Sequence, residues 1–519
     1  MGNHLSEYRV TDVVFEMRCR GIKLWTENDQ LHYQADSGAL TPEDKKKLLS
    51  YKSEIIAFLK NCLASDATPL SSRPSSCNMV PLAPFQRWVW RNWCGPDSGR
   101  SVIATRITGR INIELLRRSF TEIVCRHEAL RTGVVFVSGM MQQEIREKPV
   151  TVLQSVECPG ASVPERERKA KELVEELANE KFDFSRDLLF DAKVIELDDQ
   201  NWILIMRIHA LISDATSRKI LWREIWQIYM SYLRGQPVSL PKILQPGDVA
   251  VWHEVSNAEW TRKHGEYWET RLAGAERLRL FPITEVANTA NGRIESLTWE
   301  FGLEVTRDLR VLSRQTQTSL GMVVLAIWIA SIMRWCKKKD VVVSFQTTGR
   351  LHVETENTIG SFICPLFLRL ELQRSDTFHD FLIRVIGEYD SACRNYDFGR
   401  LIARSPEADF SRNPCLNWGP KGFYQDAMSA LNEANQCGIA DPVCLRPFEF
   451  SEPLSRDNRK SNWEPRFALV EVDNDIKGLM LRSATVSAKH CEKFADDLCR
   501  FAGSIARKPL TRVLEASCT

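Results

Sequence analysis

Apolar residues near the start of the chain recur at the spacing of an amphipathic helix. Within residues 8–20 they stand three or four positions apart, at Val10, Val13, Val14 and Met17, which places them on one helical face. Gly21 follows, and glycine readily adopts the positive φ that often ends a helix. The pattern therefore predicts a helix that ends at residue 20.

A hairpin and a second helix are predicted next. Residues 22–25 and 31–34 are short strand-like runs joined by a polar stretch at residues 27–29, which suits a tight turn. Thr41 precedes a proline and a long run of apolar residues at helical spacing, as the N-cap of a helix does. This first unit is therefore predicted to be αββα, and it is small enough to be only marginally stable by itself.

The rest of the chain has the pattern of an α/β protein. Residues 64–78 are rich in serine and proline and lack an apolar period, which predicts an extended, flexible tether. Beyond them, helical stretches such as 112–126 alternate with strand-like runs such as 202–208. A polar junction near residues 258–265 divides this remainder into two comparable segments. The boundaries we expect are 1–62 for the first unit, 63–79 for the linker, and 80–260 and 261–519 for the two segments.

Composition excludes several classes of protein. The chain has 519 residues, 44% hydrophobic and 26% charged, which is typical of a folded globular protein and excludes disorder and collagen. The net charge of +2 gives no overall field for polyanions, and no local basic patch is apparent, so we expect neither nucleic-acid nor membrane binding. The longest apolar stretch, residues 320–333, is shorter than the roughly 20 residues that cross a bilayer and is predicted to be a core helix.

Cysteine spacing predicts free thiols in a reducing compartment. The fifteen cysteines form no C-x-x-C pair and have no histidine partner at zinc-finger distance, so we expect neither a disulfide framework nor a metal site. No signal peptide is apparent, which favours the cytoplasm. A glycine-rich phosphate loop is also missing, so we expect the chain itself to bind no nucleotide or other cofactor.

The strongest chemical signal lies at the end of an apolar strand. Residues 202–208 run directly into His209, and Asp214 follows five positions later. One interpretation is a functional site in a tight turn at the strand end. The other is a buried core histidine with an aspartate that caps the helix predicted over residues 216–232. Spacing alone leaves both interpretations open.

A family resemblance favours the first interpretation. The segment from His209 to Ala215 resembles the H-H-x-x-x-D-G motif of nonribosomal peptide synthetase condensation domains, which belong to the chloramphenicol-acetyltransferase-like superfamily. Other motif blocks of that family follow the family's order, at Pro81-Leu82 with Gln86 and Trp90, residues 126–132, Asp248 with Ala250 and Trp252, residues 359–362, and residues 409–414. Gly349-Arg350 lies where the family has a Gly-Arg pair. The resemblance covers residues 80 to about 420.

The resemblance implies an α/β fold of two acetyltransferase-like lobes in a V-shaped pseudo-dimer. Acyl donor and acceptor enter a tunnel from opposite faces, each carried on the phosphopantetheine arm of a carrier protein, although a free small molecule can also serve as acceptor. The implied product is an amide or, less favoured, an ester, made by a free-standing condensation subunit of a nonribosomal peptide or hybrid polyketide assembly line.

The first unit has a resemblance of its own. Residues 21–25, 31–33 and 38–42 resemble the amino-terminal β-hairpin docking domain of the tubulysin-synthetase type. That domain captures the carboxy-terminal tail of an upstream carrier-protein subunit, in part by extending the hairpin edge. The docking residues expected from this resemblance are Lys23, Leu24, Trp25, Leu31 and Tyr33.

The catalytic position of the motif holds an alanine. Alignment on Asp214 places His209 at the first, structural histidine, and Ala210 at the second, which in the family faces the acceptor nucleophile. Moving His209 into the second role would require one extra residue in the loop. The motif aspartate pairs with an arginine in the family, which implies a structural ion pair between Asp214 and Arg350.

Other positions also depart from the family pattern. Ala215 replaces the motif glycine, Trp88 replaces an arginine of the first block, and Cys364-Pro365 replaces Asn-Thr. Side chains expected to line the tunnel are Trp88, Ser213, Cys364 and Asn413.

Three explanations of Ala210 stay open. It is a substitution introduced into an active enzyme, or the protein is an acyltransferase that works by positioning alone, or it is an inactive platform that recruits carrier proteins or tailoring enzymes. The changes at Trp88 and Ala215 argue against the first explanation by itself.

Overall fold

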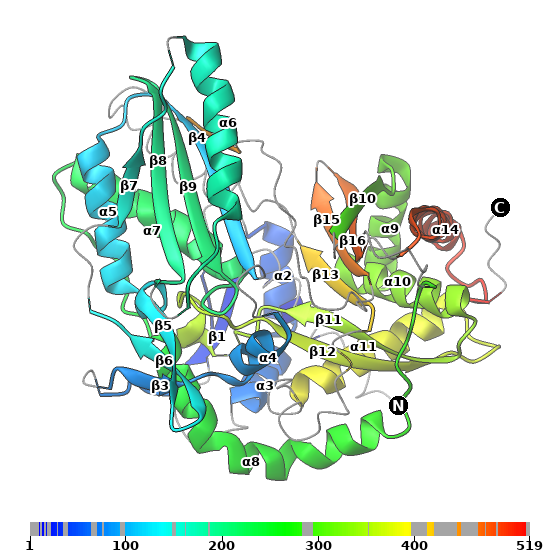
Figure 1. The fold of residues 1–519 in the computed structure, drawn as a ribbon. Helices are drawn as coiled ribbons and strands as arrows, with labels where there is room; N and C mark the ends of the chain where they lie inside the picture. The colour runs from blue at the N-terminus through cyan, green and yellow to red at the C-terminus, as the bar shows by residue number, and fades with distance from the viewer. Residues whose placement is uncertain are drawn as a thin grey trace.

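The structure, a computed structural model, describes residues 10, 13–14, 17, 22–27, 30–34, 40–63, 70–74, 77–93, 99–147, 152–160, 162–184, 187–282, 294–350, 352–395, 410, 413–419, 444–447, 465–472, 474–483 and 486–514. They form a small amino-terminal unit and two larger halves that stand side by side as a V, with a long helix along its base (Figure 1). The expected α/β arrangement is confirmed.

The amino-terminal unit combines a hairpin with helices around one apolar core. Its elements are β1 (Lys23–Glu27), β2 (Gln30–Gln34), α2 (Pro42–Ser50) and α3 (Lys52–Leu63). The strands pair antiparallel with Glu27 opposite Gln30. The core contains Val10, Val13, Val14, Met17, Ile22, Leu24, Leu48, Ile55 and Leu59, so the predicted apolar face of the first helix is buried.

Two helices stand where the pattern predicted one. Thr41 and Asp44 form a reciprocal capping box, with Asp44 Oδ2 accepting from the Thr41 backbone N–H at 2.7 Å, so the predicted N-cap is confirmed. Tyr51 then ends α2 with a non-helical backbone (φ −110°, ψ 18°). The helical period of the sequence continues across this break and therefore did not reveal it.

The first half is built on a five-stranded sheet in the order β14-β4-β9-β8-β7. The strands are β4 (Arg100–Thr108), β7 (Leu153–Val156), β8 (Phe190–Asp198), β9 (Asn201–His209) and β14 (Cys444–Pro447). Helix α6 (Val163–Asn179) covers one face, and α5 (Ile113–Arg126) and α7 (Ala215–Leu233) cover the other (Figure 1).

Burial on both faces explains the apolar run of β9. Ile203 and Ile205 join the core beneath α6, whereas Leu204 and Met206 join the main core on the opposite face. Successive side chains of a strand point to opposite faces, so a strand covered on both sides needs apolar residues at every position.

A smaller sheet lies at the base of the first half. It contains β3 (Met79–Pro81), β6 (Met140–Ile145) and β5 (Thr132–Val137) in that order. Helix α4 (Pro84–Trp93) follows β3, and a short 3₁₀ helix, η1 (Glu128–Arg131), joins α5 to β5. These elements hold the first two motif blocks next to the main sheet.

The second half has a six-stranded sheet in the order β10-β16-β15-β13-β11-β12. The strands are β10 (Ile294–Glu300), β11 (Asp340–Thr347), β12 (Cys364–Glu371), β13 (Cys415–Gly419), β15 (Arg466–Val472) and β16 (Asp475–Ser483). Its helices are η2 (Val353–Thr355), α9 (Leu303–Gln315), α10 (Leu320–Cys336), α11 (Phe378–Arg394) and α14 (Ala488–Arg507). Helix α10 is buried along most of its length, so the predicted core helix is confirmed.

The two halves share a helix and a strand pairing that the sequence did not predict. The boundary expected at residues 260 and 261 falls inside α8 (Pro246–Leu272), a continuous helix along the base of the V. Trp260 and Trp268 bury one side of this helix in the core, and the polar residues between them lie toward its other side. Strand β14 also comes from the later part of the chain and pairs with β4 of the first half.

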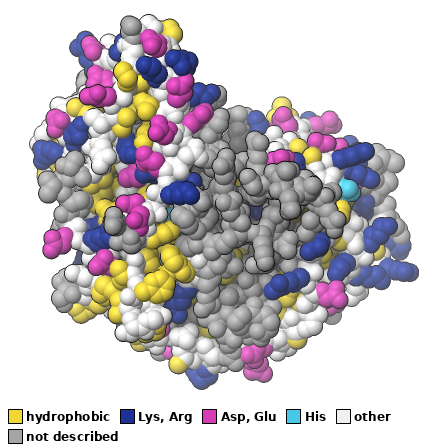
Figure 2. Space-filling model, viewed as in Figure 1, with side chains coloured by type: hydrophobic (Ala, Val, Ile, Leu, Met, Phe, Trp, Pro, Cys, Tyr) yellow, Lys and Arg dark blue, Asp and Glu magenta, His cyan; other side chains and the backbone are white. Residues whose placement is uncertain are grey.

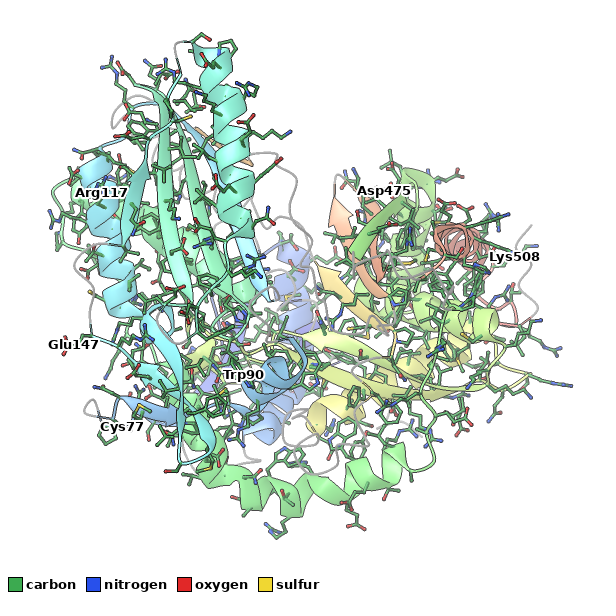
Figure 3. All side chains as sticks on the ribbon, viewed as in Figure 1. Cys77, Trp90, Arg117, Glu147, Asp475 and Lys508 are labelled. Atoms are coloured by element: carbon green, nitrogen blue, oxygen red, sulfur yellow. The ribbon has the colours of Figure 1, made fainter. Side chains whose placement is uncertain are left out.

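The tether is anchored near its carboxyl end, which corrects the prediction of a flexible linker. The side chain of Arg73 is only 6% exposed. It donates to Glu128 Oε2 at 2.6 Å and to Asp248 Oδ1 at 2.8 Å, and its Nε donates to the Cys77 carbonyl oxygen. Cys77 lies at the base of the first half (Figure 3). Two motif carboxylates therefore hold the segment that follows the amino-terminal unit.

Two composition-based expectations concern the described residues only. The cysteines whose side chains the structure describes are free thiols, namely Cys77, Cys125, Cys158, Cys336, Cys364, Cys393, Cys415, Cys491 and Cys499. Within the described part of the chain, no single helix has the length and apolar composition to span a membrane, and α9 with α10 reaches that composition only as a pair bent by 109°.

Candidate functional site

The candidate site is the loop between β9 and α7, which carries residues 209–214. Its backbone is fixed at its start, where the His209 N–H donates to the Leu189 carbonyl oxygen and the Ala210 N–H donates to the Gly99 carbonyl oxygen. The Ile212 N–H and the Ser213 hydroxyl both donate to the His209 carbonyl oxygen at 3.1 Å. The loop is therefore a closed turn with a defined conformation.

The His209 ring is packed inside the first half. It is 1% exposed and lies edge-to-face against Phe182 and Phe184, at centroid distances of 6.3 and 5.1 Å. Its Nδ1 accepts the Leu211 N–H at 3.0 Å, which assigns the ring proton of a neutral imidazole to Nε2. Trp90, labelled in Figure 3, packs edge-to-face against Phe184 and extends this cluster of aromatic side chains.

Ala210 is the partly exposed residue of the turn. Its methyl group can neither accept a proton nor form a hydrogen bond. The partly exposed position of this turn therefore carries a side chain without acid–base chemistry.

Two residues that shape this turn had no assigned role in the sequence reasoning. Gly99 has φ +77°, and a Cβ there would lie 2.8 Å from His209 Nε2, so only glycine fits. Gln86 Nε2 donates to the Leu211 carbonyl oxygen at 2.8 Å and to Gln143 Oε1 at 2.9 Å. Gln86 was visible as part of a motif block, whereas no local pattern marked Gly99.

The ion pair expected between Asp214 and Arg350 is present. Arg350 Nη1 donates to Asp214 Oδ2 at 2.7 Å, and its Nη2 donates to Oδ1 at 3.1 Å, with both side chains 3% exposed. Asp214 also caps α7 by accepting the Ser217 N–H at 2.7 Å, and it accepts the Phe362 N–H at 3.1 Å. One carboxylate thus joins the first turn of α7 to the second half.

Four residues expected to line a tunnel are packed into the protein. Trp88 is buried in the main core and stacks on Phe85, and Ser213 donates within its own turn. Cys364 is buried at the start of β12. Asn413 Nδ2 donates to the Val342 carbonyl oxygen, and its Oδ1 accepts the Leu278 N–H. These contacts fit structural roles better than contact with a ligand.

The second motif block contains a buried histidine–glutamate pair. His127 and Glu224 are each 1% exposed, with His127 Nε2 2.8 Å from Glu224 Oε2, and Arg126 Nε donates to the same oxygen at 2.9 Å. Burial lowers the pKa of His127 although the glutamate opposes this. Burial acts to raise the pKa of Glu224, but hydrogen bonds from His127 and Arg126 outweigh it, so this pKa is lowered.

Both pKa shifts predict loss of stability in acid. As the pH falls below 6.5, the ordinary pKa of histidine, the unfolded chain binds a proton at residue 127 that the folded protein resists. This weakens folding by up to about 1.4 kcal/mol per pH unit. Glu224 contributes a further loss below about pH 4.5. We expect His127→Gln, which keeps a side-chain N–H donor, to flatten the fall in urea midpoint between about pH 6.5 and pH 5.

The matched control for this variant is Ser119→Ala. Ser119 is also buried but carries no titratable group, so the substitution should leave the pH dependence of the urea midpoint as in the wild type. Equal slopes for His127→Gln and wild type would contradict the assignment.

The expected docking residues differ in burial. Leu24 is buried in the core of the amino-terminal unit, so its side chain supports the hairpin from within. Leu31 is partly buried and Tyr33 is 48% exposed, both on β2. The side chains of Lys23 and Trp25 lie outside the described residues, although their backbone forms β1.

Contacts within the chain distinguish the two hairpin edges. Strand β1 contacts η2 of the second half, whereas no described strand other than β1 pairs with β2. Antiparallel pairs alternate between hydrogen-bonded and non-hydrogen-bonded, and the pair closing a two-residue turn, here Glu27 and Gln30, is hydrogen-bonded. The backbone N–H groups of Leu31 and Tyr33 therefore point to the outer edge of β2.

Among the described residues, no group of three or more His, Cys, Asp or Glu side chains is arranged so that it could hold a metal ion.

Comparison with known proteins identifies two families. A model of the condensation domain matches residues 77–430, and a model of the TubC N-terminal docking domain matches residues 10–61. A linear gramicidin synthase protein of Brevibacillus parabrevis is 27% identical over 446 residues, which are 84% of this chain and 8% of that protein. Bacitracin synthase 1 of Bacillus licheniformis is 30% identical over 376 residues, 69% of this chain and 7% of that protein. The chain spans less than a tenth of the length of these relatives.

Solved structures share the fold. The X-domain from teicoplanin biosynthesis has a TM-score of 0.69 and 19% identity, over 87% of this chain and 99% of that one. The EpoB cyclization–docking bidomain of Sorangium cellulosum has a TM-score of 0.66 and 18% identity, over 97% of this chain and 99% of that one. Since the condensation model matches more than half of the chain, the protein belongs to the condensation-domain family of nonribosomal peptide synthetases and carries a TubC-type docking domain at its amino-terminal end.

Proposed function

We propose that this condensation protein transfers an acyl or peptidyl group from a carrier-bound thioester to an amine and forms an amide. The observation that supports this most strongly is the preserved turn at residues 209–214, which the ion pair of Asp214 and Arg350 fastens to the second half. In this proposal, a turn held in this way keeps a defined conformation at the junction of the two halves, with Ala210 at the position of the motif's second histidine.

Positioning supplies the catalysis in this proposal. The amine nitrogen attacks the thioester carbonyl, the new C–N bond forms as the C–S bond breaks, and the departing phosphopantetheine thiolate takes up the proton that the amine releases. Holding two tethered reactants in line provides a large part of the rate enhancement of such reactions. An amine reacts without a general base more readily than a hydroxyl, so amide formation is favoured over ester formation.

The partner proposed for the docking domain is an upstream carrier protein, whose carboxy-terminal tail adds a strand to the outer edge of β2. The available backbone groups of Leu31 and Tyr33 suit strand addition. The acceptor amine comes from a second carrier protein or a free small molecule. The free thiols of the described cysteines fit a cytoplasmic setting.

The function is tested by intact-mass spectrometry of carrier proteins incubated with the wild-type chain. Donor carriers are loaded with a panel of proteinogenic aminoacyl thioesters, and the acceptor is a glycine-loaded carrier. A mass gain on the acceptor that equals the donor acyl group supports amide transfer. A panel without any such gain contradicts it.

Blocking the outer edge of β2 is expected to weaken binding of the upstream carrier protein. Proline at residue 33 removes one outward N–H without removing a hydrogen bond inside the hairpin. We therefore expect Tyr33→Pro to raise the KM for the tailed carrier about tenfold, which corresponds to about 1.4 kcal/mol of binding, with kcat unchanged. Deleting residues 1–62 should have at least this effect, and it leaves the anchor at Arg73 in place.

Tyr33→Ala is the matched control, because it removes the half-exposed ring but keeps the backbone N–H. Its KM should stay closer to wild type than that of Tyr33→Pro. Unchanged kinetics after deletion of residues 1–62 would refute the docking assignment.

A second candidate function is a binding platform without acyl transfer. The X-domain from teicoplanin biosynthesis, which shares this fold, has been solved in a complex with OxyB. The tip of the β5–β6 hairpin also exposes Phe136, Val137 and Met140, and hydrophobic side chains gather on the lower left of the face shown in Figure 2. Exposed apolar patches often mark protein interfaces. This function is favoured if the chain binds the carrier proteins but forms no product from any donor in the intact-mass assay.

A further inference from the structure

Ser217, in the first turn of α7, has polar contacts with both halves. Its hydroxyl is completely buried. The Oγ lies 2.8 Å from Asp214 Oδ1 on its own helix, and 2.7 Å and 3.0 Å from the carbonyl oxygen and the nitrogen of Gly360 in the second half. Arg350 Nη2 lies 3.1 Å from the same oxygen.

The Ser217 hydroxyl acts as acceptor and donor at this junction. Its oxygen accepts the Gly360 N–H, and its single proton lies within hydrogen-bond distance of two acceptors, Asp214 Oδ1 and the Gly360 carbonyl oxygen. Arg350 Nη2 shares two protons among Ser217 Oγ, Asp214 Oδ1 and the Thr358 carbonyl oxygen, each at 3.1 Å. One oxygen atom of the first half therefore contacts both the N–H and the C=O of Gly360.

The segment around Gly360 has little freedom to move away from this contact. A Cβ on Gly360 would lie 2.6 Å from the Phe362 ring and 3.1 Å from Pro246 Cβ. The Phe362 N–H donates to Asp214 Oδ2 at 3.1 Å, and its ring lies 4.6 Å from the Arg350 guanidinium. Residues 360–362 are thus fixed at two successive points against the turn that begins with His209 and Ala210.

We propose that Ser217 is a positioning residue that sets the placement of residues 360–362 of the second half relative to the turn at residues 209–214 of the first. This inference rests on the proposed acyl transfer for its functional meaning, since donor and acceptor arrive at the junction of the halves. A displacement of about 1 Å between reacting groups can reduce a rate by about a hundredfold. Ser217 therefore acts on turnover through the position of the second half and touches no substrate.

Hydrogen exchange tests the contact independently of any substrate. In Ser217→Ala, we expect amides in the peptide covering residues 356–363 to exchange at least about tenfold faster than in wild type, because the Gly360 N–H loses its acceptor. The matched control is Ser119→Ala, which removes an equally buried hydroxyl that donates to the Leu115 carbonyl oxygen of its own helix. That control should leave the peptide unchanged. Equal exchange in Ser217→Ala and wild type overturns the proposal.

Kinetics of the wild-type reaction provide the second measurement. We expect Ser217→Ala to lower kcat by about tenfold to a hundredfold with KM for the carriers unchanged, and Ser217→Thr, which keeps the hydroxyl, to recover part of the loss. A rise in KM with kcat unchanged overturns the positioning role. Should Ser217→Ala not fold, Ser217→Cys is measured in the same exchange assay with the same criterion. If the wild type forms no product, the proposed acyl transfer fails, and hydrogen exchange alone decides whether Ser217 fixes the second half.

Discussion

Replacing Ala210 with histidine is expected to raise kcat for amide formation by about 10²- to 10⁴-fold, the usual contribution of a well-placed general base. Ala210 is the partly exposed residue of the turn, whereas the neighbouring His209 is enclosed by Phe182 and Phe184. An imidazole at residue 210 would therefore project where the family motif has its second histidine, while His209 continues to support the turn. The readout is the rate of acyl transfer between loaded carriers by intact-mass spectrometry.

Ala215→Gly is the matched control for this gain. It restores another motif residue at the exposed start of α7 but adds no group that can accept a proton, so we expect no comparable increase. If the wild type forms product and Ala210→His forms it no faster, residue 210 does not occupy the position of the motif's second histidine. No product from either protein would favour the binding platform.

Removing the Asp214 carboxylate is expected to cost about 3 to 5 kcal/mol of stability, because Arg350 is left buried without its charge partner. The same change removes the cap of α7 and the acceptor of the Phe362 N–H. Folded proteins are stable by only about 5 to 15 kcal/mol. We therefore expect Asp214→Ala to lose most of its soluble protein, measured as yield and as the urea midpoint of what remains.

Glu172→Ala provides the comparison for an exposed ion pair. Glu172 pairs with Arg168 one turn earlier on α6, and both side chains are more than 60% exposed, so its loss should change stability by less than about 1 kcal/mol. An Asp214→Ala protein with the wild-type midpoint and only slower turnover would show that the ion pair is catalytic rather than structural.

Local elements followed from the sequence with little error. The strand predicted over residues 202–208 is β9, and the helix predicted over residues 216–232 is α7 (Ala215–Leu233). The apolar run before His209 and the capping aspartate at 214 are local signals, and the structure uses both locally. The break at Tyr51 was missed because the apolar period of the sequence continues through it.

Predictions about exposure were less successful. The junction predicted near residues 258–265 lies within a continuous helix, and the predicted tether is anchored by Arg73. Trp88 and Asn413 were expected to face a tunnel, but they are packed in the protein. A linear pattern indicates how polar a residue is, but not which distant segment covers it.

The sequence by itself determined the family and the order of the elements around His209, because both depend on residue identity and short spacing. The assignment of His209 and Ala210 to successive motif positions stays a prediction. The tertiary structure decided which side chains surround that turn. Arg73, Asp214 and Ser217 each have partners that lie between 55 and 175 positions away in the chain. Such contacts form only when tertiary packing brings remote segments together, and no local periodicity encodes them.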